Sequence, residues 1–374
     1  MSNAINNEVN DISTQETPNT SLQTSTHVHP HAQYPLKVEM AAQYVNAYVI
    51  IPILAIGVFG NICTIYIFLR HKQWEKGSIH YFFALAFSDL GCLVIYGTVE
   101  WMSEGLKFAT SGTFYFDLIN YSAASCKTLR YLWNVCSFIS AWLITCVSAE
   151  RFIATRFPLQ CTKLLNTFRR KIVIATVIML GAVLFLPISV GVYDVMPIFP
   201  DATVLLCTMY HGGRAVVIIS AYFKLGANYP LPVITVILLN SLIIWSLLQA
   251  RRDRQDIRST GITEIEAKVA KSLMIISAIF LITMIPASVT WLTYSHIYIM
   301  RGSGSILSQD EKIHKAMLIE IGKLANSISM INYSVNFIVY SYNFDFYKRA
   351  LWRVVCCCCR RRQEAENHSS ISYR

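Results

Sequence analysis

The segment Trp142–Leu159, WLITCVSAERFIATRFPL, joins an apolar run to an abrupt cluster of charge. The preceding residues Tyr131–Ala149 carry no charged side chain, and Glu150 and Arg151 then stand side by side. An α-helix that crosses a bilayer needs about 20 mostly apolar residues. The stretch therefore predicts a membrane-spanning helix that ends in an ion pair at a membrane surface.

The composition extends this interpretation to the whole chain. Of 374 residues, 54% are hydrophobic and only 14% are charged, whereas about a quarter of the residues of a soluble domain are charged. Seven stretches are apolar enough to span a bilayer, and only Asp89 interrupts the second. They are Met40–Leu69, Gly77–Val99, Tyr131–Ala149, Ile172–Tyr193, Leu225–Ala250, Ser272–Met300 and Leu324–Phe344. We expect an all-α membrane protein, with a bundle of seven transmembrane helices over residues 41–344.

Lysine and arginine indicate the orientation. The loops 70–78, 151–171 and 251–271 and the segment after residue 346 hold 22 of the 32 basic residues. Because basic loops stay in the cytoplasm, we expect a multi-pass plasma-membrane protein with an extracellular N-terminus. The net charge of +10 then reflects topology, and a nucleic-acid partner is excluded.

Other classes fit poorly. The sequence has no ordered Ser-His-Asp set, metal-ligand spacing or phosphate loop, so we expect no enzyme activity. A transporter would need polar groups along a path and broken helical repeats, but only Asp89 is acidic deep in a span.

The two ends of the chain differ from the bundle. Residues 1–40 are mostly polar and predict a disordered extracellular segment. Residues 345–359 predict a C-terminal amphipathic interfacial helix, in which an apolar stripe faces the membrane and basic residues face the headgroups. The stripe is Phe346, Ala350, Leu351, Val354 and Val355, and the basic residues are Lys348, Arg349 and Arg353. Residues 360–374 form a cytoplasmic tail.

Cysteines and sequons fit this topology. Cys126 and Cys207 are the two cysteines expected in extracellular loops, where oxidising conditions favour a disulfide over two free thiols. Asn19 and Asn120 begin glycosylation sequons on the same side. A run of four cysteines follows the amphipathic helix and predicts palmitoylation. The alternative is that these cysteines are reduced and unmodified. The run consists of Cys356, Cys357, Cys358 and Cys359.

Polar residues inside the spans are candidate functional groups, because ionisable groups are costly in a bilayer. Asp89 is accompanied at similar depth by amide and hydroxyl groups, which could hold a small cation through oxygen ligands. These are Asn61, Ser140, Asn332 and Asn336. The alternative is a protonated Asp89 that is hydrogen-bonded between helices.

The charged pair Glu150-Arg151 suggests a conformational switch. Arg151 lies at the cytoplasmic end of the third span beside Glu150, and Glu266 opens the sixth span on the same side. An arginine held by an acid of another helix is a latch that opens when the helices move. The alternative is an arginine that extends towards the membrane surface with a local partner.

The ordered motifs resemble those of a rhodopsin-like (class A) G-protein-coupled receptor over residues 42–359. They are Gly60-Asn61, Leu85–Asp89, Cys126 placed before Arg151, Glu150-Arg151-Phe152, Pro158-Leu159, Leu231-Pro232, Phe280 with Pro286, and Asn336-Phe-Ile-Val-Tyr340. The resemblance implies that Arg151 enters the interface with a heterotrimeric G protein. It also implies the family disulfide Cys126–Cys207 and no cofactor beyond an allosteric sodium ion.

The resemblance assigns that ion to Asp89, Ser140, Asn332 and Asn336. It further implies arrestin, a receptor kinase and membrane lipids as partners.

The chain also departs from the family pattern. Phe152 replaces a tyrosine, Phe337 replaces the proline of the seventh helix, and Met284 stands where the sixth helix usually has a tryptophan. Phe280 and Pro286 still allow the sixth helix to kink and swing. The Asn-Phe-x-x-Tyr sequence resembles that of invertebrate neuropeptide receptors, including FMRFamide-like ones.

The outer ends of the spans suggest the ligand. Trp133 stands where amine receptors have an aspartate, which argues against amines, and Met330 replaces the retinal lysine of opsins. Charged and aromatic residues at the mouth are typical of a peptide site, the alternative being a solvated rim. They are Glu100, Trp101, Arg130 and Glu320. Glu100 would accept the arginine of an RFamide-type C-terminus. The alternative function is a chemosensory receptor for an environmental small molecule.

Overall fold

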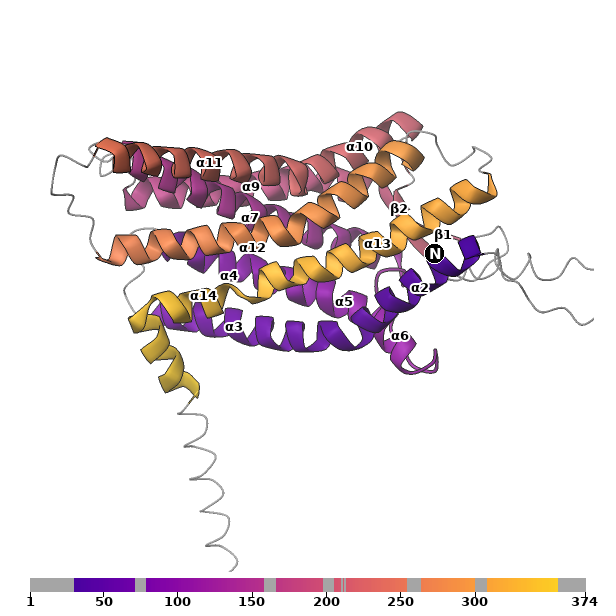
Figure 1. The fold of residues 1–374 in the computed structure, drawn as a ribbon. Helices are drawn as coiled ribbons and strands as arrows, with labels where there is room; N and C mark the ends of the chain where they lie inside the picture. The colour runs from indigo at the N-terminus through magenta and orange to yellow at the C-terminus, as the bar shows by residue number, and fades with distance from the viewer. Residues whose placement is uncertain are drawn as a thin grey trace, which may run out of the picture.

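The protein is a bundle of long helices that run side by side, with one short β-hairpin at one end (Figure 1). The computed structural model describes residues 30–70, 79–157, 166–197, 205–209, 211, 213–253, 264–299 and 308–355. We call the end that carries the hairpin the hairpin end, and the opposite end, with Arg151 and Arg170, the basic end. The sequence predicts that the hairpin end is extracellular and the basic end cytoplasmic.

Each predicted span is helical over most of its described residues, but the fourth helix ends at Gly191, and Tyr193, the predicted end of that span, begins the strand β1 (Tyr193–Pro197). The first comprises α2 (Pro30–Tyr44), the π-helical turn η1 (Val45–Val49) and α3 (Ile50–Arg70). The second comprises α4 (Ile79–Cys92), η3 (Leu93–Gly97), α5 (Thr98–Glu100), η4 (Trp101–Gly105) and α6 (Leu106–Ala109). The third is α7 (Ala123–Arg156), the fourth α9 (Thr167–Gly191), and the fifth α10 (Gly213–Asn228) with α11 (Pro230–Asp253). The sixth is α12 (Glu264–Tyr294) with η5 (Ser295–Ile299), and the seventh α13 (Gln309–Ser334) with α14 (Asn336–Asn343).

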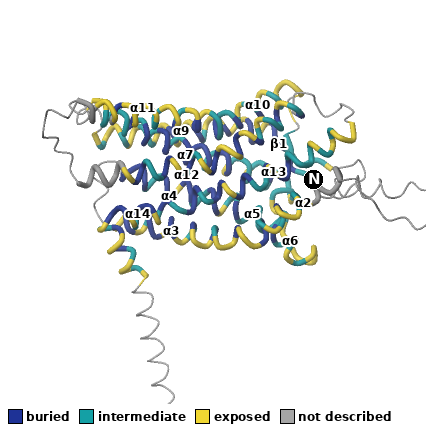
Figure 2. The backbone as a smooth tube through the Cα atoms, in the orientation of Figure 1, coloured by how far each residue is buried: buried dark blue, intermediate teal, exposed yellow. Residues whose placement is uncertain are grey.

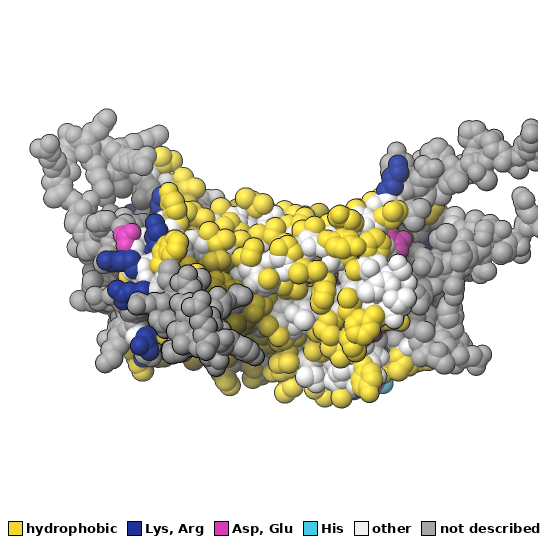
Figure 3. Space-filling view, turned by 90° about the horizontal axis from the view of Figure 1, so that it is seen from below, with side chains coloured by type: hydrophobic (Ala, Val, Ile, Leu, Met, Phe, Trp, Pro, Cys, Tyr) yellow, Lys and Arg dark blue, Asp and Glu magenta, His cyan; other side chains and the backbone are white. Residues whose placement is uncertain are grey.

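Length and hydropathy fit a membrane. Among the described residues, 6 helical runs are long and apolar enough to cross a bilayer, and α13 with α14 completes the bundle. α7 is the most enclosed of these runs, with 67% of its apolar window buried, against 28% for α9. Buried residues line the middle of the bundle and exposed residues its outer helices (Figure 2). The visible outer face is largely hydrophobic, with lysine and arginine towards its ends (Figure 3).

A β-hairpin at one end corrects the all-α prediction. β1 (Tyr193–Pro197) pairs antiparallel with β2 (Leu205–Met209), and Val195 lies opposite Cys207. Each strand has only 5 residues, and neither YDVMP nor LLCTM alternates strictly between apolar and polar residues, so no strand pattern identifies them in the sequence. The other described elements are helices, and the loop 110–122 joins α6 to α7.

Capping residues explain why the helices exceed the apolar runs. α7 begins with a capping box in which the Ser122 and Ser125 side chains bond each other's backbone N–H groups. Ser308 and Glu311 form the same motif at the start of α13. The seventh helix therefore starts at Gln309, well before the predicted Leu324.

The seventh helix breaks at Val335 without a proline. Asn61 of α3 donates from Nδ2 to the Tyr333 carbonyl at 2.8 Å, and this bond takes up an acceptor next to the break. The Phe337 ring packs against the backbone of Gly60, where a Cβ atom would overlap it. The break in the seventh helix is thus in contact with both residues of the Gly60-Asn61 motif.

Residues 345–355 are helical and turn away from α14 (Figure 1). Tyr347 and Ala350 are buried, whereas Lys348, Arg349 and Arg353 are exposed. Attachment of this segment to a membrane stays a prediction. The palmitoylation candidates Cys356–Cys359, the sequon at Asn19 and the tail lie outside the described residues.

Candidate functional site

A polar cluster lies deep in the bundle around Asp89 of α4. Asp89 is fully buried, and its two oxygens accept hydrogen bonds from Ser140 Oγ and Asn336 Nδ2, each at 2.6 Å. Three helices therefore converge on one carboxylate. Both donors are neutral, so they satisfy its hydrogen-bonding capacity without balancing a negative charge.

The two asparagines predicted nearby have different surroundings. Asn61 bonds the backbone carbonyls of Gly57 and Tyr333, so it ties helix 1 to helix 7 and does not bond Asp89. Asn332 is fully buried, and neither its side-chain oxygen nor its nitrogen has a hydrogen-bond partner in the described structure. A buried amide without partners is costly. The Asn332 amide oxygen and the Asp89 carboxylate are oxygen ligands of the kind that a small hard cation prefers.

An apolar layer separates Asp89 from the basic end. It is formed by side chains of α4, α7 and α12 around a small void. These are Tyr81, Phe82, Leu85, Leu143, Ile144, Val147, Leu273, Ile276 and Ser277. Motion of α12 would open this layer, because α12 supplies three of its side chains.

A second buried carboxylate, Glu150, organises the basic end. Arg151 Nη2 contacts Glu150 Oε1 at 3.3 Å, which is the predicted local pair. Arg170 of α9 binds the same carboxylate with both Nε and Nη2 at 3.0 Å. The Tyr81 hydroxyl donates to it as well. Glu150 is thus held by two guanidinium groups, and the bidentate one comes from a residue that the sequence motif does not include.

The remaining predicted switch residues lie on α7, α12 and α14. Glu266 is in the first turn of α12, but its side chain lies outside the described residues, so the contact with Arg151 stays a prediction. Phe152 contacts Phe157 edge-on, and Pro286 lies inside α12, nearer the hairpin end than the buried Phe280. The Tyr340 ring packs 4.6 Å from the Phe82 ring, and its hydroxyl is buried without a hydrogen-bond partner in the described structure.

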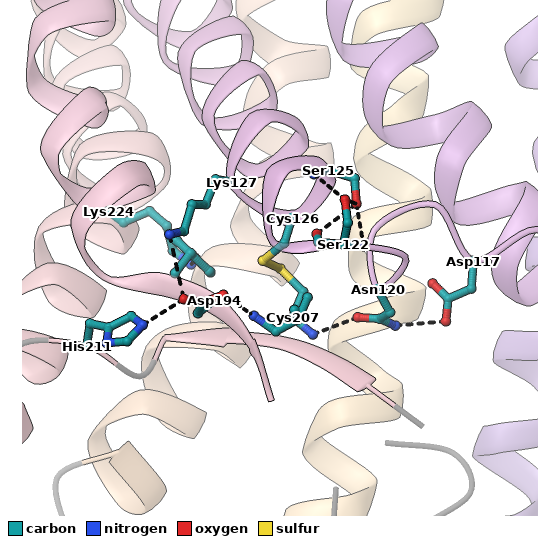
Figure 4. Close-up of a disulfide and its surroundings, with 12 residues drawn as sticks. Asp117, Asn120, Ser122, Ser125, Cys126, Lys127, Asp194, Cys207, His211 and Lys224 are labelled. Atoms are coloured by element: carbon teal, nitrogen blue, oxygen red, sulfur yellow. Dashed lines mark hydrogen bonds and ion pairs between the residues drawn. A yellow bond between two sulfur atoms is a disulfide. The ribbon is translucent and has the colours of Figure 1, made fainter. Parts of the chain in front are cut away.

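The predicted disulfide joins Cys126 of α7 to Cys207 of β2 (Figure 4). Asn120 supports it, because its Oδ1 accepts from the Cys207 N–H at 2.7 Å while its Nδ2 donates to Asp117 at 2.8 Å. The sequon asparagine therefore connects the loop before α7 to the hairpin. Glycosylation at Asn120 stays a prediction, and it would modify the nitrogen that donates to Asp117 and leave it one N–H.

Asp194 attaches the other strand (Figure 4). Its Oδ2 contacts His211 Nε2 at 2.7 Å and Lys127 Nζ at 3.6 Å, and its Oδ1 accepts from the Val195 N–H. The hydrogen bond with His211 lowers the pKa of Asp194 most, followed by the Val195 N–H and the Lys127 charge. The carboxylate is therefore ionised at neutral pH and fixes β1 to α7.

The five predicted ligand residues divide into two groups. Trp101 and Trp133 are structural contacts: Trp101 Nε1 donates to the Ala47 carbonyl at 3.3 Å, and Trp133 stacks on Tyr96 at 4.1 Å. Glu320 pairs with Lys323 at 3.1 Å, and Lys323 also lies 3.8 Å from Glu104.

Glu100 and Arg130 form the remaining part of the predicted site. Glu100 interacts electrostatically with Lys323 and Arg130. Arg130 lies 5.9 Å from the Tyr193 ring. A ligand cation at Glu100 would therefore have to compete with these two resident cations.

The profile of the seven-transmembrane receptors of the rhodopsin family matches residues 60–340. The chain belongs to this family. It is consequently a receptor, it lies in a membrane as a multi-pass protein, and it transmits an extracellular signal through a G protein. The ordered motifs, the disulfide and the bundle agree with this assignment.

Characterised relatives are distant. The receptor is 23% identical to the human uracil nucleotide/cysteinyl leukotriene receptor over 79% of its own chain and 72% of that protein. It is 28% identical to the Caenorhabditis elegans neuromedin U receptor homolog nmur-2 over 37% of its chain and 32% of that protein. Human neuromedin-U receptor 2 is 30% identical over 37% and 31% of the two chains. The family rests on the profile match, and these distant relatives leave the ligand of this receptor open.

Two contacts of the receptor escaped the motif analysis, that of Arg170 with Glu150 and that of Lys224 with Tyr193. Arg170 is one of three consecutive basic residues, and nothing in RRK distinguishes it from its neighbours. Lys224 donates to Tyr193 at 2.7 Å, although these residues are 31 positions apart. Lys224 could have been noticed, because it directly precedes the charge-free stretch Leu225–Ala250.

Proposed function

We propose that the receptor binds a peptide at the hairpin end and that the peptide drives G-protein activation at the basic end. The observation that supports this proposal is the concentration of side-chain charge at the hairpin end. Lys323 is held between Glu104 and Glu320 there, and Asp194 between Lys127 and His211. A peptide offers charged and polar groups along its length, so it can engage such a divided surface.

An RFamide-type neuropeptide is the first candidate. Its arginine would approach Glu100, as the sequence pattern suggests, and would compete with Arg130 and Lys323 for that carboxylate. The names of two relatives refer to neuromedin U, a peptide, and this agrees with a peptide ligand only in general terms. Another relative is named for uracil nucleotides and leukotrienes, so small anionic ligands belong in the same screen.

The proposed mechanism couples the two ends through helix movement. Agonist binding favours an arrangement in which α12 swings outward at Pro286, Arg151 leaves its acidic partners, and the G protein docks on the basic end. The agonist shifts this equilibrium only by its different affinity for the two arrangements. A sodium ion held by Asp89, Ser140, Asn332 and Asn336 would stabilise the inactive arrangement.

The test is expression in cells with calcium and cAMP readouts and a panel of neuropeptides. A nanomolar response to an amidated peptide supports the proposal, and a response to environmental small molecules alone would favour chemosensation. In the same cells, Glu266→Gln should raise basal signalling, because Arg151 would lose one acid. Unchanged basal signalling at equal surface expression would exclude the latch with Glu266.

The remaining assignments complete the proposal. Arrestin and a receptor kinase would act at the basic end and tail, and palmitoylation at Cys356–Cys359 would attach residues 345–355 to plasma-membrane lipids. Metabolic labelling with a palmitate analogue checks the attachment, and a variant with all four cysteines changed to serine is its control.

A further inference from the structure

Two cations lie around one buried phenol at the hairpin end. Lys224 of α10 donates from Nζ to Tyr193 Oη at 2.7 Å and lies 5.4 Å from the ring centre. The guanidinium carbon of Arg130, from α7, lies 5.9 Å from the same centre. Tyr193 itself belongs to β1 and is only 3% exposed. Three separate elements therefore bring two positive charges and a hydroxyl group together.

The nearest carboxylate in the sequence does not balance these charges. Both oxygens of Asp194 are engaged, Oδ2 by His211 and Lys127 and Oδ1 by the Val195 N–H. Within the described ranges, neither Arg130 nor Lys224 forms an ion pair, and Arg130 Nε is buried without a hydrogen bond. The partly buried charges of Arg130 and Lys224 are costly unless an opposite charge lies close to them.

Glu100 supplies only part of that counter-charge. It interacts electrostatically with Arg130, but it also faces Lys323, Glu104 and Glu320 from the other side. Lys224 has no carboxylate partner in the described structure and interacts with the Tyr193 hydroxyl instead. The cluster therefore keeps positive charge on its α7 and α10 side.

We propose that Arg130, Lys224 and Tyr193 form a subsite for an oxyanion of the agonist. For the peptide ligand proposed above, on which this inference rests, that group is a carboxylate. Tyr193 accepts its hydrogen bond from Lys224, so its own hydroxyl proton is left to donate. A guanidinium, an ammonium and a hydroxyl then converge on the anion, and charge-assisted bonds of this type are strong.

The subsite also gives the ligand a direction. The opposite side of the hairpin end, formed by η4 and α13, contains Glu104 and Glu320 around the shared cation Lys323. A ligand with separated charges would place its cationic group there and its oxyanion between α7 and α10. Complementary charge of this kind selects the orientation and the partner. The subsite thus favours a peptide with a free C-terminal carboxylate or an acidic side chain, and an RFamide-type peptide, whose C-terminus is amidated, would have to supply the oxyanion from an acidic side chain.

The first experiment needs no known agonist. The melting temperature of the purified receptor is measured in sodium acetate and in sodium phosphate, each against sodium chloride at equal ionic strength. We expect a saturable rise that disappears in the Arg130→Gln/Lys224→Gln variant. The matched control is Lys107→Gln, which removes another lysine that lies over a tyrosine ring, 5.0 Å from Tyr115. A rise with phosphate alone supports an oxyanion subsite for phosphorylated ligands. No rise in the wild-type receptor, or an equal rise in the double variant, overturns the subsite.

The second experiment separates the subsite from the proposed function. Each peptide of the panel is tested as free acid and as amide, together with a nucleoside diphosphate. The expected result is an acid form about tenfold more potent than its amide, a difference that Lys224→Gln abolishes and Lys107→Gln keeps. Peptides that act equally in both forms and are equally potent on the Lys224→Gln variant overturn the subsite and leave the peptide receptor intact. A nucleotide response that needs Lys224 supports the subsite and overturns the peptide ligand.

Discussion

Asp89 and Glu150 are both buried carboxylates, but their partners differ in charge. Asp89 is 0% exposed and is bonded by the neutral side chains of Ser140 and Asn336. Glu150 is 2% exposed and is bound by the guanidinium groups of Arg151 and Arg170. The protein itself balances the charge of Glu150, whereas Asp89 relies on a proton or a cation from solution. The two carboxylates should therefore respond in opposite ways to the same chemical change.

The largest effect is expected from Glu150→Gln. The amide keeps the shape of the side chain, but it leaves Arg151 and Arg170 mostly buried without their anion. Breaking one side of a buried ion pair costs about 3 kcal/mol or more. Thermal unfolding of the purified variant measures the loss, and basal signalling should rise at equal surface expression. Unaltered stability would contradict the view that Glu150 balances these arginines.

Arg170 should account for much of the stabilisation that Glu150 provides. In a double-mutant cycle of thermal stability, Arg170→Gln and Glu150→Gln should show an interaction energy of about 2 kcal/mol. The matched control is Arg169→Gln, because Arg169 is an exposed neighbour on the same helix turn. Its coupling with Glu150 should stay within about 0.5 kcal/mol. Equal coupling for both arginines would mean that the bidentate contact does not matter.

Asp89→Asn should have a smaller effect and the opposite sign in sodium-free buffer, where it removes an unbalanced charge. The wild-type receptor should gain about 1.4 kcal/mol when sodium reaches about ten times its Kd, and the variant should gain none. Melting temperatures in sodium and in choline chloride give the comparison. Asp117→Asn, the same change in the loop before α7, should keep the sodium effect. A sodium effect that survives in Asp89→Asn would exclude the ion site.

The smallest effect is expected at the surface, for Asp194→Asn. The pKa of Asp194 is lowered in the folded protein, so its ionised form stabilises the hairpin above the ordinary aspartate pKa of about 3.9. That contribution is lost as the pH falls through the lower folded value. The melting temperatures of the variant and the wild-type receptor should differ at neutral pH and converge below about pH 4. A constant difference would assign the effect to hydrogen-bond geometry instead of charge.

Much of the bundle follows from local patterns in the sequence. Apolar length locates the spans, and the Ser308 and Glu311 capping motif could have placed the start of α13 correctly. The disulfide followed from topology, because only Cys126 and Cys207 were expected in extracellular loops. The break at Val335 was not predictable in this way, since Asn61, a residue of another helix, supports it.

The candidate sites show the same limit. The pair of Glu150 with Arg151 is adjacent in sequence and was foreseen, whereas the stronger contact with Arg170 depends on how α9 packs on α7. Lys224 and Tyr193 meet only because the disulfide and Asp194 hold the hairpin over the bundle. A linear sequence names such residues but does not place their side chains together.

The contact between Phe337 and Gly60 also constrains how this receptor can evolve. The family motif supplies a glycine at position 60, so a large ring at position 337 meets no side chain there. Once phenylalanine occupies position 337, even alanine at position 60 would overlap the ring. The two positions are then no longer free to vary independently, and a lineage with Phe337 must keep Gly60 or lose both together. Paired sampling of these positions in a variant library would reveal this dependence as a missing combination.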